Sequence, residues 1–278
     1  MAKPKLRLKG VNVPMITPFN SDESLDEEAL RSLTEYLIEN GVHGLFPNSS
    51  VGEKAKLSKD EMKRVMSIVV DQANGRIPVT PGTGDVSTRS TIELTRYAKD
   101  VGADAAVVIE PYYYRPTSDA IYEHYKSISE SVDIPLVIYD APVFTGYSLS
   151  TDLILRLAEI ENIIAMKDST KDMVRFLTLL DSVGEKISLL QGITKLFLPS
   201  LFMGSPGGFV GGGNVIPRLT VELYDSFQKG DYKKAIQLNK QLLAVFSTCE
   251  KYGTFPSGFK AAMEILELLS MQRPAAQI

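Results

Sequence analysis

Residues 163–170 have the sequence Ile163-Ile164-Ala165-Met166-Lys167-Asp168-Ser169-Thr170. The four apolar residues that open this stretch are typical of a parallel strand buried on both faces. Lys167 follows at the carboxyl end, and lysine is almost never fully buried without a partner. Desolvation can lower the pKa of a lysine, and its free amine can then attack a ketone to form a Schiff base. We therefore expect Lys167 to be a nucleophile. The simpler alternative is a stem packed on apolar neighbours with the amine in water.

Short apolar runs bounded by Gly or Pro recur along the chain, and most are followed by a stretch of helical periodicity. The predicted strands are Val11–Phe19, Val42–Asn48, Ile77–Gly82, Ala105–Pro111, Pro135–Tyr139, Ile163–Lys167, Ile187–Gln191 and Gly208–Gly211. Eight β/α units in a chain of 278 residues predict an α/β fold, a (β/α)8 TIM barrel. A doubly wound sheet is less favoured, because no glycine-rich turn follows the first strand.

Two further helical patterns follow the eighth strand, over Tyr232–Phe246 and Phe259–Met271. They predict additional C-terminal helices that do not belong to the eight units. We expect residues 1–228 to form the barrel and residues 229–278 to form a helical extension packed on it. No linker or shift in composition indicates a second domain.

Composition narrows the possible partners and the compartment. A net charge of −4 argues against nucleic acid or an anionic membrane as the main partner. No stretch approaches the roughly 20 apolar residues of a membrane span, and the basic N-terminus is not followed by the apolar run of a signal peptide. The single cysteine, Cys249, excludes an intrachain disulfide. We expect a cytoplasmic protein that acts on small molecules.

Active sites of such barrels lie at the carboxyl ends of the strands. There, hydroxyl and backbone N–H groups of Ser49, Ser50 and Val51 could bind a substrate carboxylate, and Tyr139 could transfer protons near Lys167. Gly192 and Gly211 would leave space for a planar imine. Taken singly, each of these residues is more typical of an ordinary turn, or of aromatic cover at a barrel rim, than of a catalytic site.

Other residues are weaker candidates. His43 lies within a predicted strand and His124 within a predicted helix, so both are expected to be structural. No His, Cys, Asp and Glu set has the spacing of metal ligands. The glycines over 207–213 could cradle a phosphate, but the next basic residue is Arg218.

Four short motifs occur in order on the predicted strand ends. Residues 49–53 look like a Gly-Thr-Thr-Gly-Glu loop, residues 111–113 match Pro-Tyr-Tyr, residues 139–142 are similar to Tyr-Asn-x-Pro, and residues 166–168 surround the lysine. Together they resemble the superfamily of pyruvate-dependent class I aldolases that contains dihydrodipicolinate synthase and N-acetylneuraminate lyase. The resemblance runs from about Val11 to the final helices.

The resemblance implies a role for each matching residue. Lys167 would form an imine with pyruvate, Tyr139 would relay protons, and Ser50 with the N–H of Val51 would hold the pyruvate carboxylate. Tyr113 would reach into the site of a neighbouring subunit, which implies a homo-oligomer, commonly a tetramer built as a dimer of dimers. No metal or other cofactor is implied beyond the covalent lysine–pyruvate imine.

Two departures from the family pattern concern the substrate. Val51 stands where the family has its second threonine, so part of the proton relay would pass to Ser49, Ser169 or water. Phe144 stands where dihydrodipicolinate synthases have an arginine that binds the carboxylate of the second substrate. An apolar ring cannot pair with that carboxylate, which disfavours this activity.

The motifs around Lys167 and Tyr114 look most like those of archaeal 2-keto-3-deoxygluconate aldolases. The expected reaction is reversible cleavage of 2-keto-3-deoxygluconate, or its 6-phosphate, to pyruvate and glyceraldehyde or its phosphate. It is a carbon–carbon lyase reaction of the Entner–Doudoroff pathway of carbohydrate metabolism. Arg115 and Tyr114 would contact the polyol or a phosphate, and Ser169 a hydroxyl.

Several alternatives remain open at this point. Another lyase of the superfamily would use the same imine: one like N-acetylneuraminate lyase, a keto-deoxy-sugar-acid dehydratase, or a dihydrodipicolinate synthase. A non-catalytic barrel that binds a keto acid would be consistent with Val51. A phosphate-binding isomerase would need a carboxylate base such as Glu110 and would not need Lys167.

Overall fold

The computed structural model describes residues 6–266, in which parallel strands alternate with helices. The strands of this part of the chain are β1 (Gly10–Pro14), β2 (Gly44–Phe46), β3 (Ala106–Ile109), β4 (Leu136–Asp140), β5 (Ile163–Asp168), β6 (Ser188–Gln191) and β7 (Gly207–Phe209). Seven of the eight predicted strands are therefore confirmed, most of them with shorter bounds.

The predicted strand over 77–82 is wrong as a regular strand. This segment makes isolated parallel bridges, from Val79 to Leu45 and from Gly82 to Val107. Pro78 and Pro81 have no N–H group, so the segment cannot donate a continuous ladder of hydrogen bonds.

Helices follow most of the strands. They are α1 (Glu27–Glu39), α2 (Lys59–Ala73), α3 (Thr88–Asp100), α4 (Ser118–Ser131), α5 (Pro142–Thr145), α6 (Thr151–Leu157), α7 (Met173–Val183), α8 (Phe197–Phe202), α9 (Pro217–Gln228), α10 (Tyr232–Lys251) and α11 (Ser257–Ile265), with 3-10 turns η1 (Lys54–Lys56), η2 (Thr194–Leu196) and η3 (Gly211–Asn214). Over residues 6–266, none has the length and apolar character needed to span a bilayer.

The C-terminal helical patterns are confirmed where the structure describes them. The helix predicted over Tyr232–Phe246 is observed as α10, which extends to Lys251. The helix predicted over Phe259–Met271 corresponds to α11, and its part beyond residue 266 lies outside the described residues. The predicted division between residues 228 and 229 stays a prediction.

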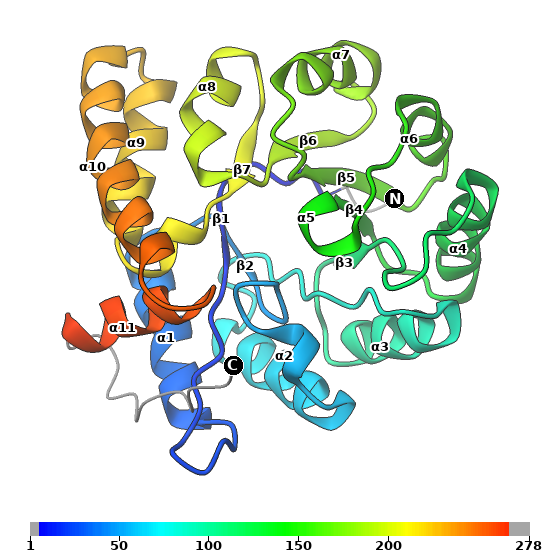
Figure 1. Ribbon diagram of the computed structural model, residues 1–278, viewed down its shortest axis with the longest axis horizontal. Coiled ribbons are helices and arrows are strands. Elements are labelled where there is room, and N and C mark those ends of the chain that lie inside the picture. Colours follow the sequence, from blue (N-terminus) through cyan, green and yellow to red (C-terminus); the bar gives the residue numbers. More distant parts are fainter. Residues whose placement is uncertain (1–5, 267–278) are drawn as a thin grey trace. The chain divides into compact units, whose positions relative to one another are not determined.

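The described chain forms two units, of which the first contains Thr80–Gly208 and the segment before Gly10. Within it, β3, β4, β5 and β6 pair in chain order, and Gln191 of β6 pairs with Gly208 of β7. Figure 1 shows α3, α4, α6 and α7 following one another along these strands. Apolar residues from these strands and from these helices pack against one another and form one core cluster, which includes Val108, Ile138, Met166 and Phe176. This core fixes the strand ends that carry Tyr139 and Lys167.

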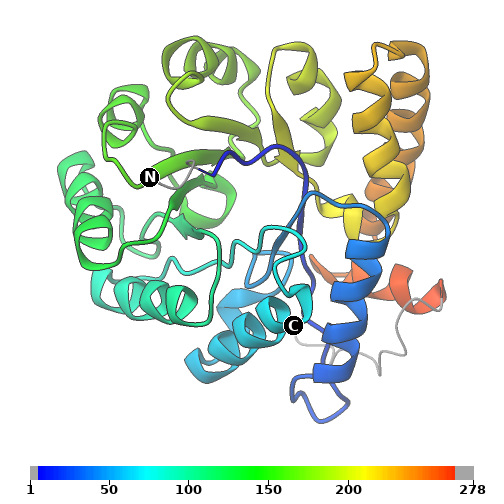
Figure 2. The ribbon, with the colours of Figure 1, turned by 180° about the vertical axis from the view of Figure 1, so that it is seen from behind.

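The second unit contains Gly10–Val79 and the described chain from Phe209 to residue 266. Here β1 pairs with β2 in parallel, with Asn12 opposite Gly44. Helices α9 and α10, yellow and orange in Figures 1 and 2, lie side by side. Helix α2 begins with a capping box, in which Ser58 and Glu61 satisfy each other's backbone N–H groups.

Candidate active site

Lys167 and Tyr139 face each other on neighbouring strands. They pair directly in the parallel register of β4 and β5. Each is 4% exposed, and the Nζ atom of Lys167 lies 3.9 Å from the centre of the Tyr139 ring. Because side chains alternate along a strand, directly paired residues project to the same face of the sheet. The strand ends thus place an amine against a phenol.

Burial changes the acid–base chemistry of this lysine. Removal of the amine from water lowers the pKa of Lys167 from 10.5 to about 7. A substantial fraction of the amine is therefore uncharged, and so nucleophilic, near neutral pH. The alternative in which the amine reaches water is wrong, because the whole side chain is buried.

Space beside the amine depends on Gly192, at the end of β6. A Cβ atom on Gly192 would lie 3.0 Å from Cε of Lys167 and would collide with the hydroxyl of Ser169. That hydroxyl is buried and has no hydrogen-bond partner among the described residues. Gly192 and Ser169 therefore border the same small space as Lys167.

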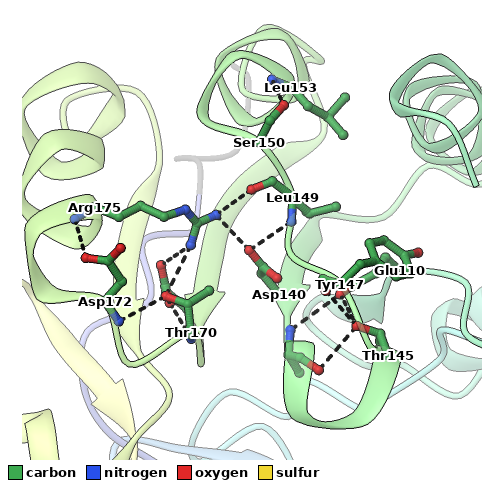
Figure 3. A network of polar contacts seen from close by, with 12 residues as sticks. Glu110, Asp140, Thr145, Tyr147, Leu149, Ser150, Leu153, Thr170, Asp172 and Arg175 are labelled. Atoms are coloured by element: carbon green, nitrogen blue, oxygen red, sulfur yellow. Dashed lines mark hydrogen bonds and ion pairs between the residues drawn. The ribbon is translucent and has the colours of Figure 1, made fainter. Parts of the chain in front are cut away.

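A buried ionic cluster begins at the next residue of each strand, where the alternation of side chains directs them to the other face; Figure 3 shows its members Asp140 and Arg175. Asp140 and Asp168 follow Tyr139 and Lys167 in the chain, and they too pair directly between β4 and β5. Arg175 of α7 reaches Asp140 at 2.7 Å with Nη2 and Asp168 at 2.8 Å with Nη1. Nothing local in the sequence marks this arginine, which contacts a carboxylate 35 residues earlier.

Glu110, just after β3, is a second buried acid near this cluster. Burial, and next the charge of Asp140, raise the pKa of Glu110 to about 8. The hydroxyl of Thr145 donates to Glu110 Oε1 at 2.9 Å (Figure 3). The pKa of Asp140 is raised to about 6, also mainly by burial, while Arg175 opposes this shift. Glu110 is thus mostly protonated at neutral pH, a state unsuited to a general base.

The tyrosine-rich segment after β3 is exposed in this chain. Tyr113 is 85% exposed, with φ of 80°, and its ring packs edge-on against Tyr114 at 4.8 Å. Arg115 is also exposed, and its guanidinium lies 5.9 Å from the centre of the Tyr147 ring. A left-handed conformation is uncommon for a residue that bears a bulky side chain. This segment is therefore held in an unusual shape at the surface of its unit.

The predicted carboxylate loop, Ser49 to Glu53, belongs to the second unit. The hydroxyl of Ser49 donates to the carbonyl of Met15 at 3.1 Å and accepts from the N–H of Gly52 at 3.0 Å. Ser49 thus shapes the loop from within. Val51 is buried, and Ser50 is half-buried.

Sequence reasoning missed the residue that anchors this loop. Lys260 of α11 is 1% exposed and forms an ion pair with Glu53, which also pairs with Lys56 at 2.8 Å. The Nζ atom of Lys260 lies 4.3 Å from the centre of the Phe19 ring.

The last of the predicted site residues, Gly211, begins η3 in the same unit. In that turn the side-chain oxygen of Asn214 accepts a hydrogen bond from the N–H of Ile16.

The histidines make structural contacts, as expected. His43 accepts a hydrogen bond from the N–H of Val11, and His124 bonds to Thr88. Burial lowers the pKa of His124 to about 4. Within residues 6–266, no group of three or more His, Cys, Asp or Glu side chains is arranged to hold a metal ion.

Comparisons with known proteins connect this arrangement to a family. Residues 7–277 match the dihydrodipicolinate synthetase family. The chain is 38% identical over 260 residues to the 4-hydroxy-tetrahydrodipicolinate synthase of Pelobacter propionicus, which covers 94% of this chain and 89% of the relative. The structure of dihydrodipicolinate synthase from Aquifex aeolicus matches with a TM-score of 0.92 at 35% identity, covering 98% of this chain and 92% of that one. The Acinetobacter baumannii enzyme, complexed with pyruvate, matches with a TM-score of 0.92 at 34% identity, covering 97% and 92%.

These matches define the class of protein first. The predicted (β/α)8 TIM-barrel fold is confirmed by the likeness of this chain to the solved structures. The chain belongs to the dihydrodipicolinate synthetase family and is an enzyme of that family's lyase type. The resemblance found in the sequence motifs is thereby confirmed at the level of the family.

Proposed function

We propose that this enzyme is a class I aldolase that reversibly cleaves 2-keto-3-deoxygluconate, or its 6-phosphate, to pyruvate and glyceraldehyde or its phosphate. The observation that carries the proposal is the buried Lys167 amine, which has a pKa of about 7 and lies 3.9 Å from the centre of the Tyr139 ring. An uncharged amine is the form that attacks a ketone.

The first step is formation of the imine. The Lys167 amine attacks C2 of the keto acid, and loss of water leaves a protonated imine that can accept electrons. By their likeness to the family's loop motif, Ser50 and the N–H of Val51 are assigned to the substrate carboxylate. The reaction needs no metal or separate cofactor in this proposal.

Bond cleavage follows from the charge on the imine nitrogen. Tyr139 relays the proton of the C4 hydroxyl, accepting it on the phenol oxygen while passing on its own proton, as the C3–C4 bond breaks and the bond electrons move to the nitrogen to give an enamine. The aldehyde leaves, C3 is protonated, and water hydrolyses the imine to release pyruvate and the free lysine.

Substrate choice rests on residues around this pair. Ser169 offers a buried hydroxyl beside Lys167, suited to a hydroxyl of the sugar acid. Arg115 and Tyr114, both exposed, are assigned to the far end of the polyol or its phosphate. Phe144, 49% exposed on α5, provides no charge for the carboxylate of the second substrate that dihydrodipicolinate synthases use.

A second candidate is 4-hydroxy-tetrahydrodipicolinate synthesis, the activity for which the Pelobacter propionicus relative is named. The high coverage of that relative favours this activity, and the imine step would be the same. Phe144 argues against this activity, because an apolar ring cannot pair with the carboxylate of the second substrate. A dehydratase or an N-acetylneuraminate-type lyase would also share the imine and differ in its product.

We further propose that the enzyme acts in the cytoplasm as a homotetramer. Exposure of Tyr113 and Tyr114, at 85% and 79%, supports an assembly in which this segment meets another subunit. If Tyr113 completes the site of a partner, mixing Tyr113→Phe and Lys167→Arg subunits will restore activity that neither variant has alone.

Borohydride trapping tests the central step. Wild-type protein incubated with pyruvate and borohydride should gain one reduced pyruvate adduct per chain, mapped to Lys167 by peptide mass spectrometry. Lys167→Arg should gain none, and the matched exposed variant Lys171→Arg should behave as wild type. An adduct elsewhere, or none, would overturn the mechanism. Release of pyruvate from 2-keto-3-deoxygluconate, measured beside 4-hydroxy-tetrahydrodipicolinate formation, then separates the two candidates.

A further inference from the structure

Arg175 connects two residues that are themselves adjacent to the reactive pair. Tyr139 and Asp140 are consecutive on β4, Lys167 and Asp168 are consecutive on β5, and the two strands pair in that register. The reactive side chains project to one face, and the two carboxylates project to the other. A contact that fixes the carboxylates therefore also fixes the lysine and the tyrosine.

The two carboxylates would push these strand ends apart on their own. Asp140 is fully buried and Asp168 is 2% exposed, so water screens their mutual repulsion poorly. Like charges placed directly opposite on neighbouring strands destabilise the pair. The regular strands also end here, at Asp140 and Asp168, where one backbone hydrogen bond, from the N–H of Ser169 to the carbonyl of Asp140 at 2.9 Å, still joins them.

Arg175 offsets this repulsion, because its positive charge lies between the two carboxylates and attracts both. Its guanidinium places one nitrogen on each carboxylate, at 2.7 and 2.8 Å, and donates to the carbonyl of Leu149 at 2.9 Å (Figure 3). Arginine stays charged and presents its donors in a rigid plane, whereas a lysine ammonium is a single point of charge. An arginine can therefore span both strand ends.

The arginine is itself held in place from several sides. Asp172 caps the start of α7 and accepts the backbone N–H of Arg175 at 2.9 Å (Figure 3). Asp168 also accepts from Thr170, from the N–H at 2.8 Å and from the hydroxyl at 2.6 Å. The arginine side chain is 14% exposed. The link between α7 and the two strand ends is thus a fixed part of the interior.

We propose that Arg175 is a positioning residue for catalysis, which holds the amine of Lys167 against the ring of Tyr139 by binding Asp140 and Asp168 on the opposite face. This inference rests on the proposed function, because it assigns Arg175 a role in imine formation by Lys167. Without the arginine, the two strand ends separate, and the amine loses both its packing and its alignment.

The test measures the rate of pyruvate–borohydride trapping at Lys167 over a range of pH. The variants are Arg175→Lys, Arg175→Met, Asp140→Asn and Asp140→Leu. The matched control is Arg156→Met, which breaks an exposed ion pair of 2.9 Å with Asp119 in the same unit. Circular dichroism and thermal melting measure the folded fraction, so that each rate is expressed per folded molecule.

We expect both Arg175 variants to lower the trapping rate by about tenfold to a hundredfold, because a displacement of about 1 Å can have that effect. The pH at which the rate is half-maximal should also move upward as the amine gains access to water. Asp140→Asn keeps an oxygen for the arginine and should retain most of the rate, whereas Asp140→Leu should not. The control should match wild type.

Two results would count against the proposal, and they are distinguishable. If wild type is trapped at Lys167 and folded Arg175→Lys shows the wild-type rate and pH profile, the positioning role is overturned while the proposed function stands. If wild type gives no adduct at Lys167, both are overturned. Should Arg175→Met fail to fold, Arg175→Lys and the two Asp140 variants decide the question.

Discussion

The Nζ atom of Lys167 lies 3.9 Å from the centre of the Tyr139 ring, and both side chains are 4% exposed. An aromatic face attracts a cation, whereas burial disfavours it. Burial is the larger effect for this lysine, since its pKa falls to about 7. The ring therefore packs against an amine that changes charge near neutral pH.

The rate of imine formation with pyruvate should follow the free amine of Lys167. We expect the trapping rate to rise about tenfold per pH unit below the pKa of about 7 and to level off above it. An ordinary lysine would show a rate that continues to rise toward its usual pKa of 10.5. Borohydride trapping in a series of buffers checks this, and a rate still rising steeply above about pH 8.5 would contradict the lowered pKa.

Replacing Lys167 with methionine should stabilise the protein. The folded pKa of about 7 lies below the unfolded value of 10.5, so the unfolded chain binds more protons between them and stability rises with pH over that interval. Near and below pH 7, the stability of the wild type is lowered by the full free energy of burying the charged Lys167 side chain. Lys167→Met should then raise the free energy of unfolding by roughly 2–5 kcal/mol, a gain that shrinks toward pH 10. Urea denaturation at two pH values measures this, with the exposed Lys171→Met as control. A gain independent of pH would point to packing alone.

The effect of Glu110 on the free energy of unfolding should depend on pH in the opposite direction to that of Lys167. Its folded pKa of about 8 lies above the ordinary 4.5, so the folded chain binds more protons between these values and stability falls as pH rises through them. Glu110→Gln keeps an oxygen for Thr145 and should stabilise the protein by roughly 2–4 kcal/mol above pH 8, with little effect near pH 5. Denaturation curves at both pH values test this. Glu130→Gln, exposed on α4, should change neither curve.

Lys260 should contribute strongly to stability through its buried ion pair with Glu53. Lys260→Met leaves Glu53, 9% exposed in its side chain, with Lys56 as its remaining charged partner. Breaking one side of a buried pair costs about 3–5 kcal/mol, whereas Lys56→Met removes a half-exposed partner and should cost about 1 kcal/mol or less. The double variant Glu53→Gln/Lys260→Met should recover much of the loss. Equal costs for the two lysines would show that burial of the pair is unimportant.

Gly192→Ala should slow imine formation without unfolding the protein. The added Cβ would lie 2.8 Å from the carbonyl oxygen of Asp168 and 3.0 Å from Cε of Lys167, so the lysine must move. We expect pyruvate trapping to slow by about tenfold or more. Gly75→Ala is the control, because its φ of 69° is strained for alanine but nothing lies within 4 Å of the added atom. It should lower stability and leave trapping unchanged.

The strands that carry the chemistry could be predicted because their signals are local. Four apolar residues before Lys167 predicted a strand over Ile163–Lys167, and β5 covers Ile163–Asp168. The strand predicted over 77–82 failed because two prolines remove the N–H donors that a ladder needs, although both are visible in the sequence.

The residues that support the site could not be predicted in the same way. Arg175 meets Asp140 across 35 residues, and Lys260 meets Glu53 from another helix. Each looks like an ordinary surface cation in an amphipathic helix until the packing brings it inward. Local periodicity identifies which residues are apolar, but it holds no information about which buried charge will pair with which.

The short helix α5 offers a route to altered substrate range. None of its residues is buried, and Val143 and Phe144 are 67% and 49% exposed. Thr145 differs, because its hydroxyl binds Glu110. A combinatorial library that randomises Val143 and Phe144 but keeps Thr145 would therefore vary the surface next to Tyr139 and Asp140 while the strand-borne amine stays untouched. Directed evolution toward new aldehydes can begin at these two positions.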